Sequence, residues 1–420
     1  MRRSLPVLIA IFLCALSAVA AGLQPTGSPG EFGPSESQLI NDSIVGSSTL
    51  SAAKITDQLT EARQLLQSTP SPSGDSVRLA VLDPDSAQLS VLSLPKDEFL
   101  TKDAQLTSTT QFDRSVRIHV MRANGVNTAV TVSDIASGKS LVPLLVQYPI
   151  VKQSKVTEVA YYTSAHPALL SPDVTSAGQA YVRTSLDEAA EELADRGVHI
   201  SGDIVDIAEH LCIVEHTDHK RFLNEKPADL FPEVLSLYAL NQRDTFRYSV
   251  STAGAGGMIQ MIPRTYDGIR ENHQNISLTP DFVTGMRDHE NALKAMLLYM
   301  NDTWNVLASK PEVQDALRTG IATKPELLAA GYNSNPQRLP GYLKDGGSAW
   351  RTIIPSETQM YLAIYSSVDK TISFQRDASS DKDVLSTASF AFGNEGPNSL
   401  PFVSWIGSRI LNGLAISLLR

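Results

Sequence analysis

The sequence has almost no cysteine: Cys14 and Cys212 are the only two in 420 residues. Cys14 lies in an apolar run at the N-terminus, and removal of that run leaves Cys212 alone. No intramolecular disulfide is then possible, so the fold must be held by its core. Leu211 and Ile213 flank Cys212, which predicts a buried thiol rather than a reactive one.

Positive charge is also in deficit, with 35 Lys and Arg against 45 Asp and Glu and a net charge of −10. This balance argues against nucleic acid as a partner, because a phosphate backbone would be repelled. It leaves neutral ligands such as glycans open. A hydrophobic content of 42% describes an ordinary soluble globular protein. The length allows two domains and linkers.

The N-terminus combines two arginines, an apolar run from Leu5 to Leu16 and small residues at 17–20. This pattern predicts a secretory signal peptide over residues 1–21, since the run is too short to span a membrane. An uncleaved anchor is the alternative. A lipid anchor on Cys14 is disfavoured because Leu13 stands where that signal needs a small residue. A secreted chain without disulfides fits the periplasm of a Gram-negative bacterium.

Composition then divides the chain. Residues 22–75 are rich in Pro, Gly and Ser at both ends and predict a linker, with one short helix over Ser51–Gln67. Residues 76–165 show period-two runs such as Val116–Val120 separated by turn residues, which predicts a small β-rich domain. No catalytic constellation is visible in it. We expect a structural role there, or docking to the cell wall or to a cell-envelope protein.

Residues 170–368 read as helical. Ala177–Arg196 predicts a helix with an acidic outer face that ends at Gly197. Further helices are expected at 203–216, 229–241, 258–270, 288–307, 311–319, 325–331 and 356–367. Residues 369–420 form a C-terminal extension whose apolar end predicts a docking helix, with a membrane span as the alternative. The fold class is therefore α+β: a mainly α domain preceded by a small β-rich domain.

One stretch concentrates unusual chemistry. Gly254, Gly256 and Gly257 precede the apolar segment Met258–Ile262, in which Gln260 is the only polar side chain. Close glycines permit a tight turn and let a ligand approach the backbone, and the segment after them predicts a helix. An amide in a cleft suits sugar hydroxyls and N-acetyl groups. The alternative is a glycine-rich turn that only packs helices together.

This stretch resembles the second motif of the soluble lytic transglycosylases, lysozyme-like enzymes that cleave bacterial peptidoglycan. That motif reads Ser-x-x-Gly-Ala-x-Gly-Leu-Met-Gln followed by an apolar pair and Pro. The residues in register here are Ser251, Gly254, Ala255, Gly257, Gln260 and Pro263. The segment Ala330-Gly331-Tyr332-Asn333 is similar to the family's Ala-Tyr-Asn motif with one Gly inserted, and Pro355–Tyr361 is similar to its closing Pro-x-x-Glu-Thr-x-x-Tyr. The resemblance implies a lysozyme-like catalytic domain, peptidoglycan glycan strands as substrate, and no cofactor.

Such an enzyme needs one general acid, a carboxyl that an apolar setting keeps protonated. Glu215 follows Ile204, Ile207, Ala208 and Leu211 on one apolar helix face, so we predict it as the acid. His216 stands where the family usually has Ser, and the connection to Ser251 is longer than in the family. Glu233 and Asp244 are the alternatives, and a domain without an acid is a third. We expect Glu233 in the first turn of a helix and Asp244 in a surface ion pair.

The resemblance implies the remaining roles. Ser251 would hydrogen-bond the acid, and Tyr332 would steady it. Gly257, Met258, Gln260 and Asn333 would contact the glycan. For Tyr332 and Asn333 the alternative is a turn that ends a helix.

A zinc site is the rival interpretation of the cluster around Glu215, with His210, His216, Asp218 and His219. No His-Glu-x-x-His spacing supports it, and we expect His216 and His219 on a solvated helix end. The resemblance thus implies a lytic transglycosylase with a single acid. A hydrolytic muramidase would need Asp218 or Asp244 as a second carboxylate. A non-catalytic wall-binding protein is the other alternative.

Overall fold

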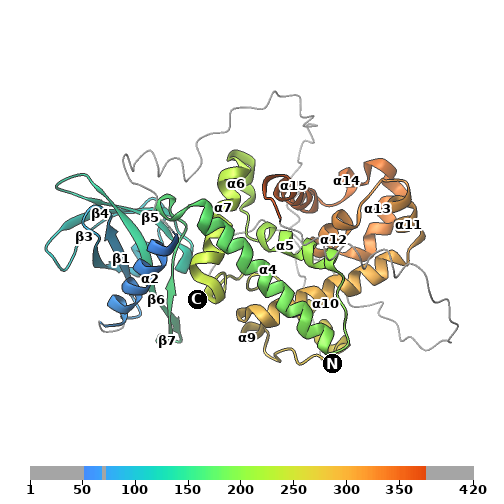
Figure 1. Cartoon of the computed structure of the whole chain (residues 1–420), viewed down its shortest axis with the longest axis horizontal. Helices are drawn as coiled ribbons and strands as arrows, with labels where there is room; N and C mark the ends of the chain where they lie inside the picture. The colour runs from blue at the N-terminus through green and yellow to red at the C-terminus, as the bar shows by residue number, and fades with distance from the viewer. Residues whose placement is uncertain (1–51, 69–71, 375–420) are drawn as a thin grey trace, which may run out of the picture. The chain divides into compact units, whose positions relative to one another are not determined.

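The computed structural model describes residues 52–68 and 72–374. The predicted signal peptide and C-terminal docking helix lie outside these residues. The chain combines a curved antiparallel sheet with a helical region, so the α+β class is confirmed (Figure 1). Among the described residues no helix is long and apolar enough to cross a membrane.

Seven strands form the sheet in the order β2-β1-β6-β5-β4-β3, with β7 paired to β6. Their bounds are β1 Ser76–Asp83, β2 Gln88–Pro95, β3 Gln105–Thr109, β4 Ser115–Arg122, β5 Ala129–Asp134, β6 Ser140–Lys152 and β7 Lys155–Tyr162. The longest strand, β6, pairs with three neighbours: β1, β5 and β7. Between the β2 and β3 sides, the Gln111 amide accepts from the Val91 N–H at 2.9 Å and donates to the Leu89 carbonyl. The sheet is thereby bent into a half-barrel.

The helix predicted over Ser51–Gln67 is present as α2, Ala52–Gln67. It does not lie free in a linker. Ile55, Ala62 and Leu66 are fully buried against one face of the sheet, where they meet Ala80 and residues of β6. The amphipathic spacing of these three residues explains both the helix and its packing.

The helical region begins with α4, Pro172–Asp195, capped by the Ser171 hydroxyl, and Gly197 follows its end with φ +82° as expected. The remaining helices are α5 Gly202–Val214, α6 His219–Asn224, α7 Pro227–Asn241, α8 Pro263–Asn272, α9 Phe282–Arg287, α10 His289–Ala308, α11 Pro311–Arg318, α12 Lys324–Asn333, α13 Leu339–Gly346, α14 Trp350–Ile353 and α15 Ser356–Thr371. Short helical turns are α3 Lys96–Phe99, η1 Gly125–Asn127, η2 Pro167–Leu169, η3 Gln242–Asp244, η4 Pro336–Arg338 and η5 Gly347–Ala349. The helices α6, α9, α13 and α14 were not anticipated, because they are short.

Helix α5 is the centre of this region. From Ile204 to Val214 every residue except Asp206 is buried, and α5 packs against α4, α10, α12 and α15. The sequence predicted one apolar face, whereas α5 is buried on all sides.

Helices α4 and α7 cross so closely that a Cβ on Gly178 would lie 1.8 Å from the Leu235 carbonyl oxygen. Only glycine fits at that crossing.

Candidate active site

Glu215 caps the C-terminal end of α5 and is 6% exposed. Its N–H donates to the Leu211 carbonyl at 3.0 Å, so the last helical turn fixes its backbone. The apolar residues of α5 thus carry a carboxyl group into the interior of the helical region. This is the setting that the sequence predicted for Glu215.

A tyrosine hydroxyl contacts this carboxyl group. Tyr361 of α15 donates to Glu215 Oε1 at 2.9 Å, across 146 residues of sequence. Tyr361 belongs to the closing motif, but the resemblance implied that Tyr332 would contact this carboxyl group. The Tyr332 hydroxyl donates instead to the Ile259 carbonyl at 2.8 Å. The closing motif was therefore the signal for this missed residue.

Glu215 lines a cavity that two parts of the chain share. The helical region contributes Glu215, His216, Thr217, Asp218, Arg221, Leu230, Glu233, Val234, Leu237, Phe246 and Ser249. The sheet region contributes Arg122, Asn124, Asn127 and Ala165. Of the residues predicted for the site, Glu215 alone lines this cavity.

The glycine motif forms a turn, not the start of a helix. Residue Gly256 bridges to both Val250 and Met261, and α8 begins only at Pro263. The helix predicted over 258–270 is therefore wrong for its first five positions. Gly257 has φ +68°, and a Cβ there would lie 2.1 Å from the Met286 carbonyl oxygen. The turn thus requires glycine for both its backbone angle and its packing.

Within this turn Gln260 is 3% exposed and has φ +45°. Its Nε2 donates to the Gly257 carbonyl at 2.8 Å. The amide that was predicted to contact the glycan therefore also ties the turn together. Met258 is fully buried, so its side chain is a core residue in this structure.

The residue after Glu215 anchors this turn. The His216 Nε2–H donates to the Met258 carbonyl at 2.9 Å, and the His216 ring stacks on Phe246 with centroids 3.4 Å apart. Burial lowers the pKa of His216 to about 3, so the ring is neutral. The expectation of a solvated helix end is wrong for His216. Together with Tyr332 and Ile259, this contact fastens the glycine turn beside Glu215.

Ser251 does not take the role that the resemblance implied. Its Oγ accepts from the Ala255 N–H at 3.0 Å, and no bond to Glu215 is present in the described chain. The reason is local, because the hydroxyl closes its own turn. Ser249 lines the Glu215 cavity instead. Asn333 is buried, and its Oδ1 accepts from the Thr358 hydroxyl at 2.9 Å. This hydrogen bond joins the segment similar to the Ala-Tyr-Asn motif to the closing motif.

The carboxylates considered as alternatives to Glu215 are bound by other protein groups. Arg221 binds Glu233 through both oxygens, at 2.7 and 2.9 Å, and also binds Glu225. Glu233 lies in the middle of α7, so its predicted place in a first turn is wrong. Asp218 Oδ1 caps α6 by accepting two backbone N–H groups. Asp244 pairs with Arg247 at 3.5 Å, as predicted.

Two further titratable groups lie on α5 but outside the cavity lining. Burial raises the pKa of Glu209 to about 7, although Arg183 lies 3.5 Å away and opposes the shift. Cys212 is fully buried, as predicted, and burial raises the pKa of its thiol. In the described part of the chain no three His, Cys, Asp or Glu side chains are grouped to hold a metal ion.

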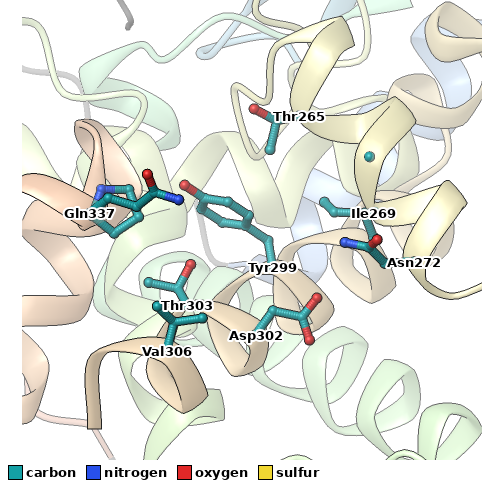
Figure 2. Close-up of a pocket in the computed structure, with 10 residues that line it drawn as sticks. Thr265, Ile269, Asn272, Tyr299, Asp302, Thr303, Val306 and Gln337 are labelled. Carbon is teal, nitrogen blue, oxygen red and sulfur yellow. The ribbon is translucent and has the colours of Figure 1, made fainter. Parts of the chain in front are cut away.

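A second cavity lies between α8, α10 and η4, and Figure 2 shows the Tyr299 ring in its middle. Gln337 lies on one side of the ring and Ile269 and Asn272 on the other. The Tyr299 hydroxyl donates to the Gly331 carbonyl at 3.3 Å, and its ring meets Tyr332 edge to face. None of the predicted site residues lines this cavity.

Comparisons with protein-family models, with curated proteins and with solved structures give no match. The resemblance to lytic transglycosylases therefore rests on the motif residues themselves.

Proposed function

We propose that this protein is a peptidoglycan lytic transglycosylase with a lysozyme-like helical domain, in which Glu215 is the general acid and base. The observation that supports this proposal most is that contacts from two of the sequence motifs meet at or beside the carboxyl group of Glu215. Glu215 is buried at a cavity and accepts from Tyr361 of the closing motif. The glycine turn is fastened beside it through His216.

In this proposal Glu215 gives its proton to the glycosidic oxygen as the bond from muramic C1 breaks. The C6 hydroxyl of the same sugar then attacks C1, and Glu215 takes the hydroxyl proton. The product is a 1,6-anhydro sugar, and the carboxyl group returns to its starting state without consuming water. Tyr361 orients the carboxyl group through its hydrogen bond to Oε1.

A single carboxylate suffices for this route, whereas hydrolysis ordinarily uses two. The second carboxylate of the cavity, Glu233, has both oxygens bound by Arg221. Asp218 caps α6, and Asp244 is absent from the cavity lining. The available partners therefore favour the transglycosylase over a hydrolytic muramidase.

The test is digestion of purified sacculi followed by mass spectrometry of the released muropeptides. We expect products one water lighter than those of a muramidase digest. Products of hydrolytic mass would overturn the assignment, and a protein that pellets with sacculi but releases nothing would be a wall-binding protein. On the predicted signal peptide we also propose a periplasmic location, which release of the protein by osmotic shock tests.

A further inference from the structure

The sheet region forms one wall of the Glu215 cavity, and a cluster around Glu158 of β7 joins it to the helical region. The Tyr248 hydroxyl donates to Glu158 Oε1 at 2.6 Å, and Arg287 Nη1 donates to Glu158 Oε2 at 3.2 Å. The guanidinium group of Arg247 lies 3.5 Å from Oε1. The two oxygens of one sheet carboxylate therefore hold two different segments of the helical region.

Both of these segments adjoin the glycine turn, residues 249–261. Tyr248 directly precedes the turn in the chain. Arg287 directly follows Met286, and a Cβ on Gly257 would lie 2.1 Å from the Met286 carbonyl oxygen. The same carboxylate is thus bonded to the residue before the turn and to the neighbour of the residue that packs on it.

The chemistry of the cluster makes it a firm connection. Tyr248 is buried, and burial together with the hydrogen bond to Glu158 raises the pKa of its hydroxyl, which therefore stays a donor. The Arg287 guanidinium lies 5.0 Å from the centroid of the Tyr248 ring, within the range of a cation–π contact. Hydrogen bonds to an ionised carboxylate are also stronger than bonds between neutral groups. Glu158 therefore restrains both segments at once.

We propose that Glu158 is a positioning residue, through which the sheet region holds the glycine turn in place beside Glu215. His216 and Tyr332 fasten the turn from within the helical region, and Glu158 fastens it from the sheet. The β-rich region is then a working part of the site as well as a structural one. This inference rests on the proposed function for what the turn contributes to cleavage.

Hydrogen exchange in the full chain tests the connection without an assay of cleavage. Glu158→Ala removes both bonds from a side chain that is 30% exposed, so little packing is lost. The N–H groups of Gly256 and Gly257, which are bonded within the turn, should then exchange at least ~10-fold faster. Asn241→Ala is the matched control, because Asn241 joins the helical region to the backbone of Thr163 in the sheet region. We expect exchange of the turn in this control to stay within ~3-fold of the wild type.

Unchanged exchange of the turn in Glu158→Ala, or an equal rise in Asn241→Ala, would overturn the proposal. Tyr248→Phe is a milder variant that keeps the ring and cuts one of the two bonds. It should speed exchange of the same amides ~3–10-fold, and it decides the question if Glu158→Ala does not fold.

Turnover of sacculi gives a second readout. It should fall ~10–100-fold in Glu158→Ala, recover in part in Glu158→Asp, which keeps the carboxylate, and stay within ~3-fold of the wild type in Asn241→Ala. Equal losses in Glu158→Ala and Asn241→Ala would reduce Glu158 to a structural role and contradict the proposal. Hydrolytic products from the wild type would instead refute the transglycosylase alone, because the exchange result does not depend on the chemistry of cleavage.

Discussion

The end of α5 and the middle of α7 each place a buried glutamate on the same cavity, and the two differ in what holds them. Glu215 accepts a hydrogen bond from the Tyr361 hydroxyl and is followed by a histidine that anchors the glycine turn. Glu233 has both oxygens on Arg221, which Glu225 also binds. An arginine that binds both oxygens of a carboxylate fixes the position of that group.

The contrast teaches that burial alone does not identify an acid. Glu215 and Glu233 are equally buried, at 6% exposed each, yet Glu215 accepts from Tyr361 of the closing motif, and the next residue, His216, binds the glycine turn. Glu233 belongs instead to the ion pairs that tie α6 to α7. We therefore expect substitutions at the two positions to separate catalysis from stability.

The largest effect should come from Glu215→Gln. Loss of the acid should reduce turnover of sacculi by ~10³-fold or more, with little change in melting temperature because Gln has the same shape. Glu233→Gln is the matched control, and we expect its turnover to stay within ~3-fold of the wild type. Its free energy of unfolding should fall by about 1–3 kcal/mol, as a charge-assisted bond is lost. The reverse pattern would transfer the acid to Glu233.

The next largest effect should come from substitutions that strain the backbone of the glycine turn. Gly257→Ala forces a Cβ against the Met286 carbonyl at a positive φ and should destabilise the fold by about 2–4 kcal/mol. Gly254 also has a positive φ, of +78°, but nothing lies within 4 Å of its Cβ position. Gly254→Ala should therefore cost only about 1 kcal/mol. Urea denaturation of both variants measures the difference, and equal losses would show that the close packing is not needed.

A smaller effect separates the two tyrosines. Tyr361→Phe removes the hydrogen bond to Glu215 and should reduce turnover ~10–100-fold with a nearly unchanged melting temperature. Tyr332→Phe removes the bond to the Ile259 carbonyl and should cost about 1 kcal/mol of stability, with a smaller loss of turnover. If Tyr332→Phe has the larger kinetic effect, Tyr332 steadies the acid after all.

The last expected effect is on the pH dependence of stability. Burial lowers the pKa of His216 to about 3, below its unfolded value of about 6.5. Between these values the unfolded chain binds a proton that the native chain does not, so stability falls as the pH falls. From pH 6.5 to 4.5 one such histidine contributes a loss of about 2–3 kcal/mol. His216→Gln should reduce the pH dependence of the urea midpoint, and His166 and His289, whose pKa values burial lowers to about 4, should account for part of the slope that remains. An unchanged slope would contradict the burial of the His216 ring.

Local patterns predicted the long elements well. The helix α5 and the buried carboxyl group at its end follow from apolar spacing around Leu211, and α2 and α10 follow in the same way. The helix predicted over Met258–Ile262 was wrong. An apolar run without glycine is typical of a helix, but this segment forms a buried turn that depends on the positive φ of Gly257. Long-range contacts left no such local signal, apart from the closing motif that contains Tyr361. Tyr361 reaches Glu215 from a distant helix, and the sheet wall with Asn127 could not be predicted from either segment alone.

The most direct test of a single-carboxylate mechanism is digestion of sacculi in water enriched in ¹⁸O, with the label followed by mass spectrometry. If the C6 hydroxyl attacks the anomeric carbon, the released anhydro-muropeptides carry no ¹⁸O. Incorporation of one ¹⁸O at the anomeric carbon of the products at the time of cleavage would show that water is the nucleophile. That result would contradict the role given to Glu215 and require a second carboxylate.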